Sequence, residues 1–430
     1  MGCQPSKDED SSDASSSSTG LLNINEASVD ELMSLPGIGR RRAEKIVAHR
    51  ERQGPFHSAE ELAEVQGIGQ GLAGKVAEHV TFEDDDKPYQ FFACLPGPFA
   101  CCQSTVRCVQ GSFGSCFGSG TEEALFFPDD EVKTGLSRLL ELLRSARRQL
   151  DVAVFSISHK DLAAALLDAH RRGVTVRVLT DDMQAKQDNS LVPTLRRTLP
   201  VRMDDNEKMH MHHKFVVIDG ATLLSGSLNW THAAVERGNE NLVVSQHPAL
   251  CAEFTQEFRR LWQLFSEKSG PSTAPVGRFS GEVAVLFFPE PSMTNVQMIL
   301  EELESARRSI EIAVFTLTLD LLVNALIKKH EAGLRVRIIT DNRQAEVPGA
   351  DAARLSKSGL EVRVDRSWYA MHHKFAVVDQ KTIVNGSFNW TAQATKGNQE
   401  DAIIFRNYST LASEFTAEFD RLWNSFQPYH

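Results

Sequence analysis

Short apolar runs alternate with helical patterns along the larger part of the chain. Residues 310–315 and 336–340 have the mainly apolar character of buried strands. Between them, residues 321–329 have the spacing of an amphipathic helix, with Asp320 as the predicted N-cap. Strands that alternate with helices favour an α/β fold, so we predict a largely parallel sheet that is covered on both faces.

The apolar run at residues 214–218 is a further predicted strand, and candidate chemistry lies at both of its ends. Because side chains on a strand alternate between faces, His212 and Lys214 share one face and His213 lies on the other. We therefore expect His213 to be structural. Asp219 has the opposite parity and precedes a glycine, so we expect it to shape the turn and orient its neighbours without touching substrate.

The same arrangement recurs 160 positions later as His372, Lys374 and Asp379, with His373 as the second structural histidine. Four further pairs of segments match: 125–128 with 286–289, 145–148 with 305–308, 153–155 with 313–315, and 258–262 with 419–423. A unit of this length is half a domain, because solenoid repeats are only roughly 20–50 residues long. Two such halves in one chain are expected to pack about a pseudo-twofold axis.

Each half continues with a Gly-Ser-x-Asn segment and then a glutamate, at equal distances from its first histidine. The chain therefore carries two copies of one set of polar residues. The set is His212, Lys214, Ser227, Asn229 and Glu240 in the first half, and His372, Lys374, Ser387, Asn389 and Glu400 in the second.

Two copies of this set suit the hydrolysis of a phosphodiester without a metal. One imidazole can attack phosphorus and form a covalent phosphohistidine, which divides one difficult displacement into two easier ones. The other imidazole can protonate the leaving oxygen and then activate water, which contributes roughly 10²–10⁴-fold. The lysines and asparagines supply donors for the non-bridging oxygens, and a glutamate on the far ring nitrogen fixes the tautomer. Near-identical halves leave open which histidine attacks.

A metal site is the alternative reading of the cluster His210, His212 and His213. The second half has no counterpart of His210, so the cluster is not part of the repeated set. We therefore predict that the reaction uses neither a metal nor a cofactor.

The repeated His-x-Lys-x₄-Asp, Gly-Ser-x-Asn and Glu pattern resembles the phospholipase D superfamily, and most closely its mitochondrial cardiolipin hydrolase (Zucchini-like) family. The resemblance covers roughly residues 122–266 and 282–428. It implies two α/β lobes, an active site shared by two histidines, and a phosphodiester substrate in lipid or nucleic acid. Members of that family have one copy per chain and dimerise, so here we expect an intramolecular site and an active monomer. The family's zinc-binding insertion is absent, because residues 128–139 and 289–300 contain neither cysteine nor histidine.

Residues 21–82 contain a second duplication, with an offset of 30, in which Gly-Ile-Gly turns stand between short helical patterns at residues 28–34 and 40–52 and their counterparts. A Gly-x-Gly turn at a helix N-terminus exposes backbone N–H groups that can hold phosphate. The segment resembles the tandem helix-hairpin-helix module of the ComEA type, which implies sequence-independent DNA binding. The candidate residues are Gly37, Gly39, Arg40, Arg41, Lys45, Gly67, Gly69 and Lys75. The alternative is an interaction module without nucleic acid, because acidic residues outnumber basic ones here.

The extreme N-terminus fits a myristoylation pattern at Gly2, and Cys3 beside it is a candidate for a second, palmitoyl anchor. We expect residues 1–20 to be disordered. Five of the seven cysteines fall at positions 94, 101, 102, 108 and 116. We assign their segment, 83–121, to a linker, while a palmitoylated, membrane-apposed segment remains open. A second linker is predicted at residues 268–281.

The net charge of −11 excludes a protein that is positive over its whole surface. No apolar stretch reaches the roughly 18 residues that span a bilayer, and no secretory signal is evident, so we expect a cytoplasmic protein. Lipidation would attach it to a membrane, and the resemblance alone points to the mitochondrial surface.

The predicted architecture is a small all-α helix-hairpin-helix domain (21–82) followed by two phospholipase D-like α/β lobes (122–267 and 282–430). The favoured function is a metal-independent nuclease on DNA or RNA, because a phosphate-binding hairpin module has little use in a purely lipid enzyme. The first alternative is a phospholipase or cardiolipin hydrolase acting on membrane phospholipid. The second is a DNA-binding adaptor with an inactive site.

Overall fold

The computed structural model describes residues 22–25, 27–53, 56, 58–82, 122–128, 134–267 and 273–430. The predictions for Gly2, Cys3, the disordered N-terminus and the cysteines between positions 94 and 116 lie outside these residues. The chain divides into two compact units, residues 1–112 and 113–430, and each is described by itself.

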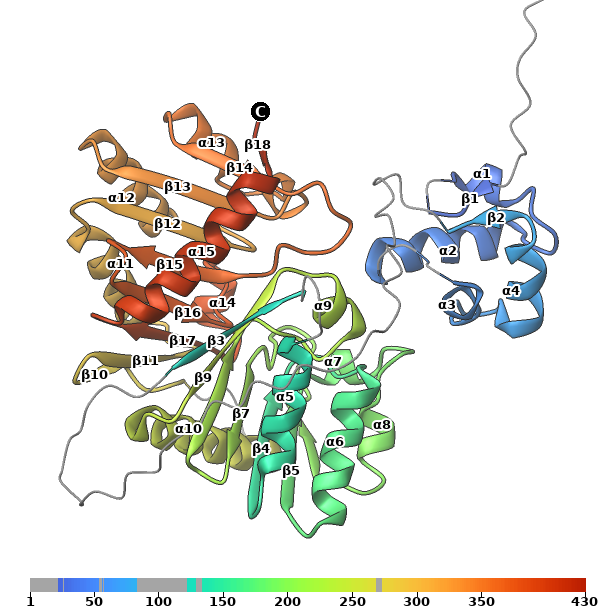
Figure 1. Cartoon of the computed structure of the whole chain (residues 1–430), viewed down its shortest axis with the longest axis horizontal. Helices are drawn as coiled ribbons and strands as arrows, with labels where there is room; N and C mark the ends of the chain where they lie inside the picture. The colour runs from blue at the N-terminus through green and yellow to red at the C-terminus, as the bar shows by residue number, and fades with distance from the viewer. Residues whose placement is uncertain are drawn as a thin grey trace, which may run out of the picture. The chain divides into compact units, whose positions relative to one another are not determined.

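The N-terminal unit is a set of short helices closed by one pair of very short strands (Figure 1). Its elements are β1 (Leu22–Asn23), α1 (Val29–Leu32), α2 (Arg40–Gln53), α3 (Ala59–Ala63), α4 (Gly69–Ala77) and β2 (Val80–Thr81). Ser28 begins α1 with a reciprocal capping box, in which its side chain accepts from the Glu31 N–H and the Glu31 carboxylate accepts from the Ser28 N–H. The strands β1 and β2 pair in parallel and bring the two ends of the unit together.

The second unit contains two lobes with the same order of elements. Lobe 1 consists of β3 (Glu123–Phe127), α5 (Thr134–Ser145), β4 (Gln149–Val154), α6 (Lys160–Arg171), β5 (Thr175–Thr180), α7 (Asp182–Ala185), α8 (Val192–Leu195), β6 (Val201–Met203), β7 (Lys214–Ile218), β8 (Thr222–Gly226), α9 (His232–Glu236), β9 (Glu240–Ser245) and α10 (Pro248–Glu267). Its sheet has the strand order β3-β9-β8-β7-β4-β5-β6.

Lobe 2 repeats this order and adds short strands at both edges of its sheet. Its elements are β10 (Arg278–Ser280), β11 (Val283–Phe288), α11 (Thr294–Ser305), β12 (Ser309–Val314), α12 (Asp320–Glu331), β13 (Arg335–Thr340), η1 (Gln344–Glu346), α13 (Ala352–Lys357), β14 (Glu361–Val364), β15 (Lys374–Val378), β16 (Thr382–Gly386), α14 (Ala392–Lys396), β17 (Glu400–Phe405), α15 (Ser409–Ser425) and β18 (Gln427–Pro428). Its sheet has the order β10-β11-β17-β16-β15-β12-β13-β14-β18. The predicted linker 268–281 therefore includes a strand, β10, which pairs with β11.

The prediction of a largely parallel sheet is wrong, because both sheets are mixed. Only the pairs joined by crossover helices are parallel, β4–β5–β6 in lobe 1 and β12–β13–β14 in lobe 2. The strand that follows each histidine motif is joined to the next by a tight turn, which forces antiparallel pairing. Asp219 and Gly220 form that turn in lobe 1, both with positive φ.

The predicted helix cap at Asp320 is also displaced by one residue. Leu319 is the N-cap of α12 and makes no side-chain cap bond, and Asp320 is the first helical residue. The Asp320 carboxylate instead pairs with the Arg354 guanidinium at 2.6 Å.

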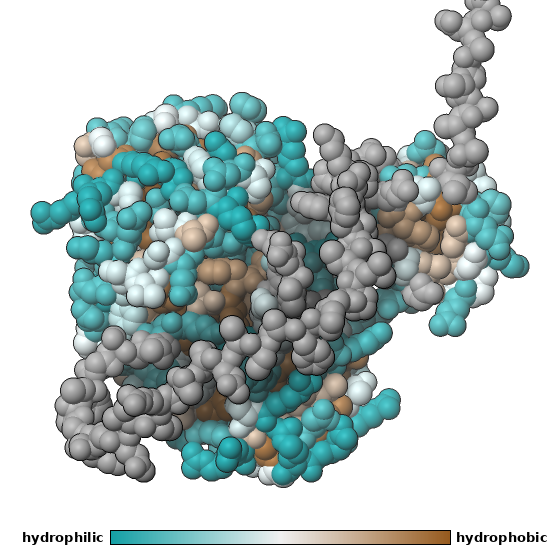
Figure 2. Space-filling view, in the orientation of Figure 1, coloured by the Kyte–Doolittle hydropathy of each residue, from teal (hydrophilic) through white to brown (hydrophobic). Residues whose placement is uncertain are grey.

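Three apolar cores hold the two lobes. Each lobe has its own core between its sheet and its outer helices, α5 and α6 in lobe 1 and α11 and α12 in lobe 2. A third core is shared, because the long helices α10 and α15 bury Phe254, Phe258, Phe415 and Phe419 together with residues of both sheets. On the face shown in Figure 2, hydrophilic side chains cover most of both lobes. The shared core fixes the relative position of the two histidine motifs.

Candidate active site

Backbone hydrogen bonds hold each histidine motif to the opposite lobe. In lobe 1, the His212 N–H donates to the Gln399 carbonyl of lobe 2 at 2.9 Å. In lobe 2, the His372 N–H donates to the Asn239 carbonyl of lobe 1, also at 2.9 Å. Each motif is therefore held by the segment that precedes the other lobe's glutamate, and the two half-sites are related by a pseudo-twofold exchange.

The glutamates are exchanged between the lobes. Glu400 of lobe 2 contacts the His212 Nδ1 at 2.7 Å, and Glu240 of lobe 1 contacts the His372 Nδ1 at 2.9 Å. Both carboxylates are buried. When ionised, each glutamate favours the proton on Nδ1, and Nε2 of the ring is then unprotonated and available for chemistry. Neither lobe contains a complete half-site.

Lys214 and Lys374 lie buried beside the histidines. Each Nζ donates to the carbonyl of its own motif's first histidine, at 2.5 Å to His212 and 2.6 Å to His372. Burial lowers the pKa of Lys214 to about 8 and that of Lys374 to about 7. A bound phosphate would oppose this effect, because a negative charge favours the protonated amine.

The two catalytic candidates are neutral imidazoles in the free protein. Burial lowers the pKa of His212 well below its usual value, and the charges of Lys214, Lys374 and the other site histidine lower it further. Burial also lowers the pKa of His372, to about 4, although Glu240 opposes the effect. Because each histidine senses the charge of the lysines of both lobes, the four groups form one electrostatic site.

A phenylalanine flanks each histidine and lysine. The Phe155 ring meets the His212 ring edge-to-face at 4.8 Å, and the Phe315 ring meets the His372 ring in the same way at 4.7 Å. The Lys214 and Lys374 ammonium groups lie over the same two rings, at 4.8 and 5.0 Å. These aromatic contacts were not among the predicted site residues, although both phenylalanines belong to a repeated segment.

Asp219 and Asp379 lie away from the histidines, at the turns that end β7 and β15. Each carboxylate accepts hydrogen bonds from three consecutive backbone N–H groups, those of residues 147–149 and 307–309. These bonds outweigh burial and lower the pKa of both carboxyl groups. The structure thus places both aspartates where they brace the sheet and cannot touch a phosphate at the histidines.

The Gly-Ser-x-Asn segments pass the histidines along the neighbouring strand. Ser227 is buried, and its hydroxyl accepts the Asn241 N–H at 2.9 Å, as Ser387 does for Asp401. These serines anchor the segment. The buried Oδ1 atoms of Asn229 and Asn389, which follow these serines, have no hydrogen-bond partner within the described residues. Both amides therefore retain hydrogen-bonding capacity for a ligand.

His213 and His373 are fully buried on the opposite face of their strands. The His213 Nδ1 contacts Asp401 of the other lobe at 2.7 Å. The equivalent contact of His373 is to the Asn241 amide, at 2.9 Å. Both rings thus connect the lobes below the site.

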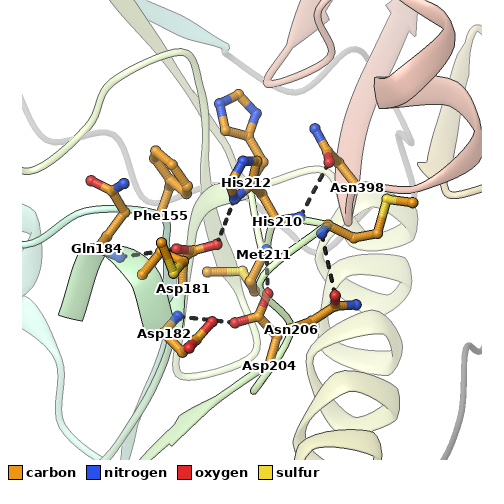
Figure 3. Close-up of polar contacts among 12 residues, drawn as sticks. Phe155, Asp181, Asp182, Gln184, Asp204, Asn206, His210, Met211, His212 and Asn398 are labelled. Atoms are coloured by element: carbon orange, nitrogen blue, oxygen red, sulfur yellow. Dashed lines mark hydrogen bonds and ion pairs between the residues drawn. The ribbon is translucent and has the colours of Figure 1, made fainter. Parts of the chain in front are cut away.

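His210 lies close to His212 and makes contacts that the sequence did not indicate. Its Nδ1 contacts the buried Asp181 carboxylate at 3.0 Å, and its ring meets Phe155, which also flanks His212 (Figure 3). Hydrogen bonding to Asp181 raises the pKa of His210. Ala370 occupies the equivalent position in lobe 2, so only lobe 1 carries this third imidazole. Within the described part of the chain, no three His, Cys, Asp or Glu side chains form a cluster that could hold a metal ion.

The candidate DNA-binding residues of the N-terminal unit are all exposed: Gly37, Gly39, Arg40, Arg41, Lys45, Gly67, Gly69 and Lys75. Gly37 and Gly67 have φ of 78° and 93°, which side chains rarely adopt. Arg42 was missed by the sequence analysis. Its guanidinium donates to the carbonyls of both glycines, at 2.7 and 2.8 Å, and thereby ties the two hairpin turns together.

Comparison with protein families bears on the two lobes and on the N-terminal unit. A family model described as the phospholipase D-like domain of cardiolipin synthase matches residues 139–262 and 299–423, together more than half of the chain. The chain belongs to the phospholipase D superfamily. A helix-hairpin-helix model matches residues 17–81. Membership of the superfamily makes the chain a phosphodiester hydrolase and confirms the predicted two-lobed fold.

Curated relatives match about a third or more of the chain. Mitochondrial cardiolipin hydrolase of Chlamydomonas reinhardtii is 39% identical over 167 residues, which are 34% of this chain and 75% of the relative. The protein of the same name from Xenopus tropicalis is 39% identical over 183 residues, 43% of this chain and 81% of the relative. The crystal structure of phosphatidylserine synthase from Haemophilus influenzae covers 72% of this chain and 87% of its own at 16% identity, with a TM-score of 0.54, and shares the fold. None of the described helices is long and apolar enough to cross a bilayer.

Proposed function

We propose that the chain is a metal-independent nuclease that acts through a covalent phosphohistidine. The observation that carries the proposal is the reciprocal pairing of His212 with Glu400 and of His372 with Glu240. It gives one site two imidazoles, each with Nδ1 held by a carboxylate and Nε2 left for chemistry.

The first step is an in-line displacement at phosphorus. The Nε2 of one neutral histidine attacks, a P–N bond forms, and the P–O bond to the leaving group breaks. The Nε2 of the other histidine, protonated in the substrate complex, gives its proton to the leaving oxygen. Lys214 and Lys374 compensate the charge on the non-bridging oxygens, and the glutamate stabilises the imidazolium that develops on the attacking ring.

The second step reverses these roles. The histidine that gave its proton removes one from water, the water oxygen bonds to phosphorus, and the P–N bond breaks. The electron pair of that bond returns to the attacking imidazole, which is again neutral. The products are a phosphomonoester and an alcohol, and no redox change occurs.

The N-terminal unit supports nucleic acid as substrate. Its four candidate glycines are exposed, and a Cβ at Gly39, Gly67 or Gly69 would meet no atom within 4 Å, so that the backbone at these turns is open to a ligand. An open turn before a helix N-terminus suits a phosphate backbone, which is common to all sequences.

The test is cleavage of labelled single-stranded DNA and RNA in EDTA by the wild type and by the His212→Ala/His372→Ala variant. Histidine-dependent cleavage supports the proposal. If the wild type cleaves neither polymer but hydrolyses a small diester such as bis(p-nitrophenyl) phosphate, nucleic acid is not its substrate.

The role of the hairpins can be tested separately with Gly39→Leu. Gly39 lies at the start of α2, its φ is not positive, and its Cβ position is open, so we expect the variant to fold. We expect about tenfold weaker binding of double-stranded DNA, because the side chain keeps phosphate from the backbone. Gly74→Ala, at an open position in α4, is the matched control and should bind as the wild type does.

A second candidate function, hydrolysis of membrane phospholipid, is favoured by the curated relatives, which are named for cardiolipin hydrolysis. It predicts histidine-dependent release of phosphatidic acid from cardiolipin vesicles and indifference to Gly39→Leu. An adaptor with an inactive site would hydrolyse neither substrate and would keep its DNA binding in the double histidine variant.

A further inference from the structure

An exposed tryptophan lies beside the site on lobe 2. Trp368 is 48% exposed, the largest value for any large apolar side chain in the described residues. It stands four positions before His372, so its Cα lies within roughly 14 Å of that histidine's Cα. Tyr369 follows it and is partly buried. Burial alone does not account for an indole in this position, since about half of the residue's surface remains in contact with solvent.

Two arginines lie against these rings. The Arg343 guanidinium is 5.0 Å from the Trp368 ring centroid, and the Arg237 guanidinium is 5.8 Å from that of Tyr369. Arg237 belongs to lobe 1 and stands two positions before Asn239, whose N–H donates to the Ala370 carbonyl at 2.9 Å. We call Arg237, Arg343, Trp368 and Tyr369 the aromatic rim. Both lobes contribute to it. Trp368 and Tyr369 directly precede the segment, residues 370–372, that Asn239 of lobe 1 holds by two backbone hydrogen bonds.

Lobe 1 has no equivalent of this rim. Met183 stands where lobe 2 has Arg343, and Lys208 and Met209 stand where it has Trp368 and Tyr369. The loop of lobe 1 also carries Asp205 and Glu207, so its charge is mixed. The segments that flank a nearly symmetric catalytic centre are therefore unequal, with aromatic surface and positive charge next to His372 only.

We propose that the aromatic rim is a stacking platform for a base that flanks the scissile phosphate in single-stranded nucleic acid. The proposal rests on the proposed function and adds the strand type and the side of entry. Bases of a single strand expose their faces, and any base can stack on an indole. The guanidinium groups of Arg237 and Arg343 can pair with the phosphates on either side of that base. A membrane-inserting surface would instead require contiguous apolar residues, whereas Arg366 and Ser367 precede Trp368.

The experiment compares Trp368→Ala with Trp368→Phe and with Leu321→Ala, an exposed apolar residue on α12 that serves as control. Substrates are a single-stranded oligonucleotide, the same oligonucleotide with one abasic position next to the cleaved bond, and bis(p-nitrophenyl) phosphate. We expect Trp368→Ala to raise KM for the oligonucleotide about tenfold with little change in kcat, and Trp368→Phe to restore most of the loss. Leu321→Ala should match the wild type.

The abasic substrate makes the assignment specific. With the wild type, the abasic oligonucleotide should raise KM about as much as Trp368→Ala does with the intact oligonucleotide. Trp368→Ala should raise KM for the abasic oligonucleotide no further. Equal losses on the oligonucleotide and on bis(p-nitrophenyl) phosphate would overturn the proposal, because they would indicate a structural role.

Two further outcomes separate this inference from the proposed function. If the wild type cleaves oligonucleotides and Trp368→Ala leaves KM unchanged, the role of the aromatic rim is refuted and the proposal of a nuclease is retained. A wild type that cleaves no nucleic acid refutes the nuclease, and the rim assignment falls with it. Loss of binding to anionic vesicles in Trp368→Ala, with oligonucleotide KM unchanged, would assign the rim to a membrane instead.

Discussion

The two lobes agree in the groups that would touch the reacting phosphate and differ in the groups around them. Both supply histidine, lysine, asparagine and an exchanged glutamate with closely matching contacts. They differ in the residues that surround those groups. His210, close to His212 in lobe 1, corresponds to Ala370, and Asp401, which contacts His213, corresponds to Asn241, which contacts His373. The reaction needs two imidazoles of matched geometry, whereas substrate orientation needs the entrance to be unequal.

The most severe way to break the comparison is to remove one histidine. We expect His212→Ala and His372→Ala each to lower kcat on bis(p-nitrophenyl) phosphate by roughly 10³-fold or more, because one half-site cannot serve both roles. The double variant should be about as inactive as either single variant. Circular dichroism provides the folding control, and a single variant with substantial activity would contradict a shared site.

Exchanging the glutamates for glutamines tests whether the lobes depend on each other. We expect Glu240→Gln and Glu400→Gln each to lower kcat by roughly 10²-fold, since the amide no longer holds the proton on Nδ1 or stabilises the imidazolium. The decisive measurement is a double-mutant cycle. Glu400→Gln should add little to His212→Ala, its partner across the interface, and additive losses would count against the crossed pairing.

The pH dependence of kcat/KM sharpens the comparison between the two histidines. The attacking imidazole must be neutral, so activity falls as pH drops through its pKa. Burial lowers that pKa to about 4 for His372 and well below its usual value for His212. If His372 attacks, an acid limb near pH 4 is therefore expected, and a profile without that limb would count against attack by His372.

The lysines contribute to the alkaline limb, together with the histidine that must be protonated to act as the acid. Burial lowers the pKa of Lys374 to about 7 and that of Lys214 to about 8, so kcat/KM should fall as pH rises through this range and the ammonium groups lose their protons. Lys374→Arg should move this limb upward, because a guanidinium stays charged. A profile that is flat to pH 9 would show that charged lysines are not required.

The smallest expected effect comes from making lobe 1 resemble lobe 2. His210→Ala removes a cation that lowers the pKa of His212, so we expect a change in kcat/KM of only about two- to fivefold, with any acid limb due to His212 moving to higher pH. Ala370→His is the reciprocal variant, in which Asp341 stands where Asp181 does in lobe 1. Identical acid limbs in the wild type and His210→Ala would show that the third imidazole does not influence the reaction.

Period and repetition in the sequence were sufficient to predict the strand 214–218, the two lobes and the turn position of Asp219. They were insufficient for the direction of strand pairing, because alternating patterns are the same in parallel and antiparallel strands. They could not show that Glu400 serves His212, since sequence order places Glu240 closer. Exchange between lobes is a property of tertiary packing.

The residues that escaped prediction share a physical reason. His210, Arg42 and Trp368 act through neighbours that are distant in sequence or belong to one copy of a repeat only, so neither spacing nor repetition marks them. Repetition identifies what two halves have in common. The asymmetric groups become visible only when the halves are placed in space.

The exchanged glutamates also determine how the enzyme responds to dilution and to mutation. A site divided between separate subunits empties when the subunits part, but two lobes in one chain face each other at an effective concentration on the order of millimolar, whatever the concentration of protein. In a symmetric dimer every substitution would also occur twice, once in each half-site. Because the two halves are joined in one chain, a substitution can occur in one half alone. His210, whose equivalent in the other half is Ala370, is an example.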